Sequence, residues 1–468
     1  MISSQPHIHA VASPVCTVGP NEPEANNHAT NPHSVIVTGG CGCLGQHLVR
    51  ELILMNKSLS LDIQHIIILD TRPWDPFWHL FTSNTPDDQS TLNNETNGPL
   101  QEAKKDKFPS AEEEERMVRW FKVDLCDDHA VKDLFKHLVE KFENISTVFH
   151  TMSTTLMWAP HMAYFDNVNV KVTRLLLDIA QEHDCIKNFI YTSSGVIFWR
   201  PGMDETTDLK EDTVQTVIRD ENGHVIGVEL NFNRDIPEKT DYGYVLSKQE
   251  ATRMVSERAF SQKNLNTMSL AVTTNLYGEA ENHSLTTTFV KYGGMVSLGM
   301  IFNSIYAGNA ALGHVLAMKA MMDPEKAPKL RGMVYIISDN THSNHLECVR
   351  EVLKRVTGDF EGYAEHNTTK LPIVVLSMMN YWYKLYNNSV HMLSSCYEGA
   401  KQWFTTPLST DFLMQWTYKK GKYISKGELA REELSYYEKY QAEECYQDVA
   451  SYLLRLEELG KIKIYRDR

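Results

Sequence analysis

Residues 37–45 read Val-Thr-Gly-Gly-Cys-Gly-Cys-Leu-Gly, and this stretch decides the fold. A short β-branched run, 34–38, leads into it, and leucines at helical spacing follow in 44–55. A Gly-x-Gly-x-x-Gly spacing permits a tight turn and lets the backbone approach a pyrophosphate at the amino end of a helix. The stretch therefore predicts a strand, a dinucleotide-binding turn and a helix in succession.

The same alternation continues along the chain. Expected strands lie at 34–38, 66–70, 120–123, 147–150, 188–192 and 268–273, and expected helices at 44–55, 129–142, 164–182 and 242–260. Such alternation predicts an α/β fold, a Rossmann-type doubly wound parallel sheet with helices on both faces. Further on, helical stretches are expected at 288–302 and 308–322, a strand at 334–338 and a helix at 345–356.

The chain divides into four expected regions. These are a disordered leader (1–33), an NAD-binding Rossmann domain (34–273), a smaller substrate-binding region (274–370), and an apolar, aromatic segment with a helical tail (371–468). Two insertions interrupt the Rossmann domain, at about 71–117 and 201–240. The acidic run 112–115 in the first reads as a solvated surface. Asn-Gly between two alternating runs in the second predicts a β-hairpin.

Net charge and cysteine content argue against several classes of function. The 468 residues carry a formal net charge of −14, so a nucleic-acid-binding role is not expected. Eight cysteines without a Cys-x-x-Cys pair argue against a disulfide scaffold or a zinc ribbon and indicate a reducing compartment. No metal site is expected.

Acidic residues follow two of the expected strands. Asp70 ends the second strand, where a carboxylate accepts hydrogen bonds from the adenosine ribose and disfavours the 2′-phosphate of NADP. Arg72 acts in the opposite direction, so NAD is expected and NADP is not excluded. Asp124 follows the next strand, toward the adenine edge. The expected cofactor contacts are Gly39, Gly40, Gly42, Leu44, Gly45, Asp70, Asp124 and Lys248.

A second group of residues has the chemistry of proton transfer. Tyr244 and Lys248 are four residues apart and share one face of the expected helix. An ammonium near a phenol lowers its pKa, which suits a tyrosine that exchanges a proton with a carbinol during hydride transfer. Ser194, with Ser193 as the alternative, lies at the carboxyl end of a strand, where ligands of such sheets bind. Tyr242 is the register alternative to Tyr244, but it has no lysine four residues on.

These residues resemble the extended short-chain dehydrogenase/reductase superfamily, and within it the 3β-hydroxysteroid dehydrogenase family, including the sterol-4α-carboxylate 3-dehydrogenases. The resemblance covers roughly residues 34–340. The segments that carry it are VTGGCGCLG (37–45), VFHTMS (148–153), NVNVKVTRLLLDIA (167–180), FIYTSSGVIF (189–198), YGYVLSK (242–248), TNLYGE (274–279), YAGNAALGHVLA (306–317) and GMVYIISDN (332–340).

The resemblance implies that Ser194, Tyr244 and Lys248 form the catalytic trio of an NAD-dependent oxidation of a steroid or sterol 3β-hydroxyl. Isomerisation follows in one branch of the family and decarboxylation in another. Asn309 and His314 match a stretch on the substrate side, although a helix that faces the core explains them equally well. The family tends to carry a hydrophobic tail that attaches it to the endoplasmic reticulum membrane.

That tail matches residues 371–386, which are apolar and aromatic but short for a membrane span. A helix lying in the membrane surface, on the cytoplasmic face of the endoplasmic reticulum, is the expectation. A core or lid helix in a cytoplasmic protein is the alternative. The oligomeric state stays open, and a homodimer is compatible with the sequence.

Two departures from the family leave other functions open. Val272 and Thr273 stand where the family often has Arg-Pro, and the 201–240 insertion lengthens the distance from Ser194 to Tyr244. One alternative is an extended short-chain dehydrogenase that acts on a nucleotide-sugar or another alcohol. Another is a cofactor-binding scaffold without turnover, against which the intact catalytic trio argues.

Overall fold

The computed structural model describes most of the chain between residues 32 and 464. The described residues are 32–82, 107–142, 144–154, 162–198, 209–232, 243–261, 265–273, 275–281, 295–296, 301–339, 345–358, 368–369, 378, 381–382, 385, 389 and 422–464. Contacts group residues 32–468 into one unit, separate from residues 1–31. The expected leader therefore lies almost wholly outside the described residues.

A seven-stranded parallel sheet forms the centre of the fold. In spatial order its strands are β13 (Val334–Ile337), β8 (Asn266–Val272), β5 (Asn188–Ser194), β4 (Ile145–His150), β1 (His33–Thr38), β2 (Ile63–Asp70) and β3 (Val118–Lys122). The strand order reverses between β1 and β4, and ligands of open α/β sheets bind beside such a point. The predicted doubly wound sheet is confirmed, with strand bounds within a few residues of those expected.

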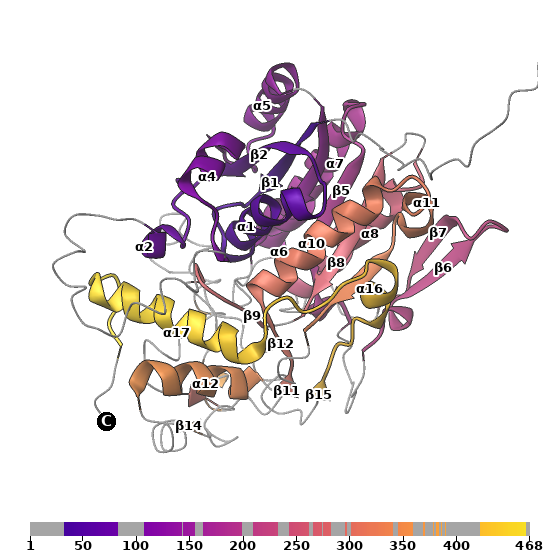
Figure 1. Ribbon diagram of the computed structural model, residues 1–468. Coiled ribbons are helices and arrows are strands. Elements are labelled where there is room, and N and C mark those ends of the chain that lie inside the picture. The colour runs from indigo at the N-terminus through magenta and orange to yellow at the C-terminus, as the bar shows by residue number, and fades with distance from the viewer. Residues whose placement is uncertain are drawn as a thin grey trace, which may run out of the picture. The chain divides into compact units, whose positions relative to one another are not determined.

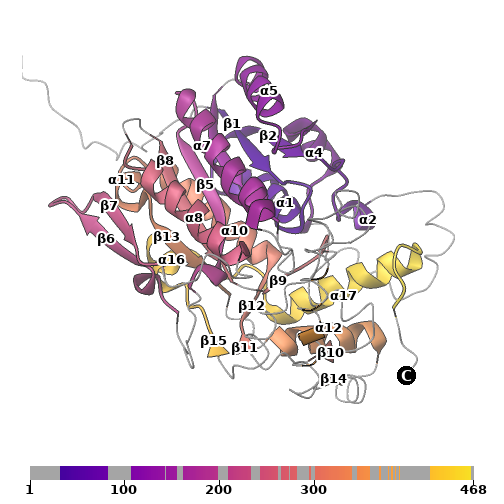
Figure 2. The ribbon, with the colours of Figure 1, turned by 180° about the vertical axis from the view of Figure 1, so that it is seen from behind.

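Helices cover both faces of the sheet because side chains alternate along its strands. Figure 1 looks onto the face of α1 (Cys43–Ser58) and α10 (Ala307–Met322), which pack against each other. Figure 2 shows the opposite face, with α7 (Val172–Glu182) and α8 (Gly243–Arg258). On that face α5 (Asp128–Lys141) joins them in a second apolar cluster. The sheet is thus buried from both sides, as its apolar strands require.

The described flanks of the first insertion are ordered by a buried carboxylate. Glu114 lies on α4 (Ala111–Met117) and accepts the indole N–H of Trp74 and of Trp78, each at 2.8 Å. His79, at the start of α2 (His79–Thr82), lies 3.0 Å from the same carboxylate. The reading of 112–115 as a solvated run is therefore wrong for Glu114, which is buried. The run is solvated on one helix face only, because two tryptophans cover the other.

The predicted hairpin is confirmed as β6 (Gln215–Arg219) and β7 (Val225–Leu230), with Gly223 at a positive φ of 76° in its turn. The same insertion covers the free edge of β13. The Gln215 amide donates to the Val334 carbonyl and accepts from the Val334 N–H. Glu211 lies just before β6, in the short helix η5 (Glu211–Thr213). Its carboxylate accepts a hydrogen bond from Ile336 N at 3.0 Å. Side chains thereby satisfy the edge that would otherwise be open to another strand.

Glu211→Gln is expected to stabilise the protein at alkaline but not at acidic pH. Burial raises the pKa of Glu211 to about 7 in the folded protein. Between the ordinary pKa of a glutamate and this raised value, Glu211 is protonated in the folded state and ionised in the unfolded state. Stability therefore falls as pH rises through this window, and the glutamine removes a penalty on the order of 2 kcal/mol at about pH 8. The midpoint temperature of thermal unfolding should be higher for the variant than for the wild type at about pH 8, and the two midpoints should coincide at about pH 5. An equal difference between the midpoints at both pH values would contradict this prediction. Glu229→Gln, on the exposed side of β7, is the control variant.

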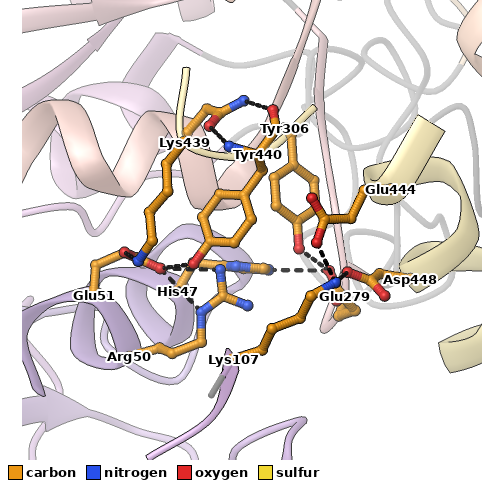
Figure 3. A network of polar contacts seen from close by, with 11 residues as sticks. His47, Arg50, Glu51, Lys107, Glu279, Tyr306, Lys439, Tyr440, Glu444 and Asp448 are labelled. Atoms are coloured by element: carbon orange, nitrogen blue, oxygen red, sulfur yellow. Dashed lines mark hydrogen bonds and ion pairs between the residues drawn. The ribbon is translucent and has the colours of Figure 1, made fainter. Parts of the chain in front are cut away.

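The C-terminal segment is part of the core rather than an appendage. Helix α16 (Glu428–Glu433) packs against β13, and α17 (Ala442–Glu458) packs against α12 (His345–Thr357). The network of Figure 3 ties this segment to α1, because Glu51 accepts from Lys439 Nζ at 2.7 Å and from the Tyr440 hydroxyl. Arg50 Nε also donates to Glu51, at 3.2 Å. The segment therefore closes over the outer face of α1.

Several short strands lie outside the central sheet. Besides the β6–β7 hairpin, the described residues form three pairs of short strands outside the main sheet. These are β9 (Asn275–Tyr277) with β12 (Ser304–Tyr306), β10 (Met295–Val296) with β14 (Thr368–Thr369), and β11 (Ile301–Phe302) with β15 (Lys422–Tyr423). The helix expected at 288–302 is wrong where that range is described, since 295–296 and 301–302 are strands. Among the described residues no helix is both long and apolar enough to cross a bilayer.

Candidate active site at the carboxyl edge of the sheet

The glycine turn between β1 and α1 is shaped by close backbone approaches. Gly39 has a φ of 70°, and a Cβ there would lie 2.8 Å from Met152 Cα. A Cβ on Gly45 would lie 2.3 Å from the Gly39 carbonyl oxygen, and one on Gly40 would lie 2.6 Å from Ile68 Cγ2. Gly42 is the N-cap of α1 and brings no side-chain cap, so the first N–H groups of α1 remain available to an anion. The turn thus fits a dinucleotide pyrophosphate.

Gly45→Ala is expected to disrupt this turn. The added methyl would collide with backbone atoms that cannot move aside, so we expect at least about tenfold weaker cofactor binding, together with a loss of about 1–3 kcal/mol of stability. Titration of NAD by tryptophan fluorescence and thermal unfolding measure the two effects. The control is Gly227→Ala on β7, where the nearest atom to the new Cβ would be 3.4 Å away. Equal effects of the two substitutions would contradict this role of Gly45.

Asp70 and Asp124 occupy different environments. Asp70 ends β2, is buried, and accepts Cys41 N from the glycine turn at 3.0 Å. Asp124 is exposed, and its carboxylate accepts Cys126 N at 2.9 Å in the turn that leads into α5. The structure therefore places Asp70 directly against the glycine turn. The described contacts of Asp124 are those of a loop-capping residue.

Ser194 and Tyr244 meet at the carboxyl edge of the sheet. Ser194 is the last residue of β5, and Tyr244 lies in the first turn of α8. Burial raises the pKa of Tyr244 to about 12. A hydrogen bond with Ser194 has the smaller, opposite effect on that pKa. Ser193 points elsewhere, because its hydroxyl lies 2.7 Å from Thr252 Oγ1. Of the two candidate serines, Ser194 is the one brought to the tyrosine. Tyr242 lies outside the described residues.

Lys248 lies one helical turn beyond Tyr244 and is also buried. Its ammonium donates to the Thr192 carbonyl at 2.9 Å and lies 4.8 Å from the centre of the Tyr191 ring. Burial lowers the pKa of Lys248 to about 7. The ammonium is thus held by β5, on the same helix as the tyrosine that it is expected to assist.

The sequence reasoning missed Asn169, which links the segment after β4 to α8. Its side-chain oxygen accepts from Thr154 N at 3.0 Å, and its amide donates to Ser247 Oγ at 3.0 Å. Asn169 lies in a π-helical turn, η3 (Asp166–Lys171), between α6 (Met162–Phe165) and α7. Such turns re-aim side chains and recur at functional sites. The apolar periodicity of 164–182 predicts the helix but carries no sign of this turn.

A second unpredicted residue, His150, connects the glycine turn to η3. Thr173 donates to the Asn169 carbonyl at 2.6 Å, so His150 Nε2 must donate to Thr173 Oγ1, 3.0 Å away. His150 Nδ1 then accepts from Thr38 Oγ1 at 2.8 Å. Burial and, next, the nearby Lys248 ammonium lower the pKa of His150 to about 3, which agrees with a neutral ring. The chain of hydrogen bonds joins β1, β4 and α7 beneath the site.

Asn309 and His314 face the core. The Asn309 amide donates to Asp339 at 3.1 Å and to the Tyr440 carbonyl at 2.9 Å. His314 lies 2.8 Å from Thr192 Oγ1 and is fully buried. Both residues hold α10 to neighbouring elements, so the described contacts favour the core reading of this stretch.

The chain is similar to proteins of known family and structure. The sequence model of a family described as 3-beta hydroxysteroid dehydrogenase/isomerase matches residues 36–373. Among solved structures, a dTDP-glucose 4,6-dehydratase from Bacillus anthracis in complex with NAD superposes with a TM-score of 0.53 at 14% identity, covering 91% of this chain and 98% of its own.

Two further structures are similar to the same extent. A UDP-glucuronic acid 4-epimerase from Bacillus cereus in complex with NAD has a TM-score of 0.53 at 15% identity, with coverages of 90% and 97%. An enzyme from Bordetella bronchiseptica in complex with NAD+ and UDP has a TM-score of 0.51 at 14% identity, with coverages of 92% and 94%. At these identities the likeness shows the fold alone, and it agrees with the predicted Rossmann-type α/β sheet.

Proposed function

Because this chain belongs to the 3-beta hydroxysteroid dehydrogenase/isomerase family, we propose that it oxidises the 3β-hydroxyl of a steroid or sterol with NAD. The observation that carries the proposal is the placement of Ser194, the last residue of β5, beside Tyr244 in the first turn of α8, with Lys248 one turn further along the same helix. These three side chains lie at the edge of the sheet to which the glycine turn also belongs. We further propose that residues 34–273 bind the cofactor and 274–370 contribute to the substrate side.

The residues around the glycine turn suit NAD. The turn and the free N–H groups at the start of α1 would hold the pyrophosphate, and Asp70 would meet the adenosine ribose. NAD supplies the hydride acceptor for a carbinol carbon. The complexes of the structurally similar dehydratase and epimerase with NAD support the same cofactor.

Side chains of the protein would accept the proton of the substrate hydroxyl. The Ser194 hydroxyl would hold the substrate oxygen, and Tyr244 would accept the carbinol proton as the carbon–hydrogen bond breaks. Because burial raises the pKa of Tyr244, the phenol needs help to act as a base. The Lys248 ammonium is the cation on the same helix that would stabilise the phenolate. The buried surroundings strengthen this interaction relative to water.

A second candidate function is the oxidation or epimerisation of a nucleotide-sugar, which the similar dehydratase and epimerase structures favour. A substrate panel separates the two. Purified protein receives NAD with a Δ5-3β-hydroxysteroid, a 4-carboxysterol or a UDP-sugar, and NADH and sugar products are measured. NADH with a sterol alone supports the first proposal. Turnover of the UDP-sugar alone would replace it, and cofactor binding without any turnover would indicate a scaffold.

We also propose that the protein attaches peripherally to the cytoplasmic face of the endoplasmic reticulum membrane. Met378, Tyr381, Trp382 and Leu385 are helical, follow a spacing that puts them on one helix face, and are 57%, 63%, 65% and 41% exposed. An exposed apolar and aromatic face suits the boundary of a bilayer. Most of 371–386 otherwise lies outside the described residues. Co-sedimentation with phosphatidylcholine vesicles should fall when Trp382 and Leu385 are both changed to serine.

A further inference from the structure

The Lys248 ammonium is buried against β5 without a carboxylate beside it. Its Nζ donates to the Thr192 carbonyl at 2.9 Å and lies over the ring of Tyr191, 4.8 Å from the ring centre. In the part of the chain that the structure describes, no Asp or Glu side chain pairs with this lysine. A buried cation that has lost its water needs another source of stabilisation, or it gives up its proton.

The ring face of Tyr191 offers that stabilisation. Tyr191 lies on β5, is almost fully buried, and belongs to the apolar cluster that includes residues of α8. The face of an aromatic ring attracts a cation that lies within about 6 Å of the ring centre, and the attraction grows when water is excluded. The ring therefore supplies to Lys248 part of what solvent supplies to a lysine at the surface.

The hydroxyl of Tyr191 has no comparable use. Within the described residues this buried hydroxyl lacks a hydrogen-bond partner. Burial and, to a smaller extent, the neighbouring Tyr244 raise the pKa of Tyr191 well above its ordinary value. Tyr191 therefore keeps its proton and does not compete with Tyr244 for the proton of a substrate. The ring is the part of this side chain that acts on the site.

The titratable groups around Lys248 are uncharged near neutral pH. On β4, burial and, next, the Lys248 ammonium lower the pKa of His150 to about 3. On α10, burial lowers the pKa of His314, which contacts β5, to about 4. On α8 itself, burial raises the pKa of Tyr244 to about 12. A change of charge in this cluster near neutral pH therefore belongs to Lys248, whose pKa burial lowers to about 7.

From this geometry we propose that Tyr191 is a positioning residue, whose ring face keeps the Lys248 ammonium charged and in place on the helix that carries Tyr244. The inference rests on the proposed function and deepens it, because Lys248 is the cation that would stabilise the Tyr244 phenolate. A cation–π contact in a desolvated site should raise the affinity of Lys248 for its proton at least about tenfold.

Three substitutions of Tyr191 separate the ring from the hydroxyl. Tyr191→Phe keeps the ring face, Tyr191→Leu removes it, and a trifluorinated phenylalanine at this position keeps the shape but weakens the negative face. NMR of protein labelled with carbon-13 at lysine Cε measures the proton affinity of Lys248, whose signal is the one missing in Lys248→Arg. The affinity should stay within about twofold of wild type for Phe and fall at least about tenfold for Leu, with the trifluorinated variant between them.

The turnover rate gives a second readout, which a packing defect would not reproduce. At about pH 8, kcat of Tyr191→Leu should be at least about tenfold below that of Tyr191→Phe, because less of its Lys248 is charged. The difference should vanish toward about pH 5, where Lys248 is protonated in both variants. Tyr446→Leu is the control, since it removes another fully buried ring, which faces Arg355. It should leave the proton affinity of Lys248 unchanged.

Failure of the inference and failure of the proposed function look different. An unchanged proton affinity of Lys248 in Tyr191→Leu and in the trifluorinated variant would overturn the role of Tyr191, and so would a kcat deficit of equal size at both pH values. If Tyr191→Leu does not fold, the trifluorinated variant decides. The NMR titration needs no substrate, so the role of Tyr191 is decided even if the wild type turns over no substrate, a result that would overturn the proposed function alone.

Discussion

Tyr244→Phe should abolish turnover while leaving cofactor binding intact. The substitution removes only the phenolic oxygen, which is hydrogen-bonded to Ser194 in a buried setting. The ring still fills its place beside Phe165. General acid–base catalysis by one side chain contributes about 10²- to 10⁴-fold, so NADH formation should fall by that factor. Initial rates measure the loss, and fluorescence titration with NAD measures binding.

The matched control is Tyr436→Phe, which also removes a buried phenolic oxygen, but from the segment just after α16 rather than from α8. It should keep nearly full activity. If Tyr244→Phe retained more than about a tenth of wild-type turnover, or if both variants lost activity alike, Tyr244 would not be the proton acceptor.

Glu51→Gln should cause the largest loss of stability. Glu51 is fully buried and faces three donors, the Arg50 guanidinium, the Lys439 ammonium and the Tyr440 hydroxyl (Figure 3). The amide keeps the shape but removes the charge, which leaves a fully buried arginine without its carboxylate. Removing one partner of a buried ion pair costs about 3–5 kcal/mol. Urea unfolding should show a midpoint shifted strongly to lower urea.

A surface ion pair provides the comparison. Glu250→Gln breaks the pair with Arg253 on α8, whose side chains are 39% and 42% exposed. Exposed pairs contribute about 0–1 kcal/mol, so this midpoint should hardly move. If the Glu51 and Glu250 variants unfolded at the same urea concentration, the attachment of the C-terminal segment through Glu51 would be unimportant for stability.

Local patterns were enough to predict the frame of the fold. The strand, glycine turn and helix at the start of the Rossmann domain each leave a short-range signature, and so does the Asn-Gly hairpin. The resemblance to known dehydrogenases, which placed Ser194 and Tyr244 in one site, depended on motifs in sequence order. In the structure Ser194 ends β5 and Tyr244 lies in the first turn of α8, and their shared catalytic role stays a prediction.

Features that depend on distant partners could not be predicted. Glu114 reads as solvated because its indole partners lie 36 and 40 residues away along the chain. Glu51 meets Tyr440 across 389 residues, and no periodicity records such a contact. The π-helical turn that aims Asn169 has the same apolar spacing as the helix around it. Each of these is a tertiary effect that overrides the local pattern.

The most direct test of the central claim follows the hydride. A 3β-hydroxysteroid deuterated at the carbinol carbon is incubated with the protein and NAD, and the cofactor is analysed by mass spectrometry. Direct oxidation at that carbon predicts NADH one mass unit heavier and a 3-ketosteroid in equal amount. Steroid recovered unchanged with no deuterium in the cofactor, while the protein still binds NAD, would contradict the proposed activity.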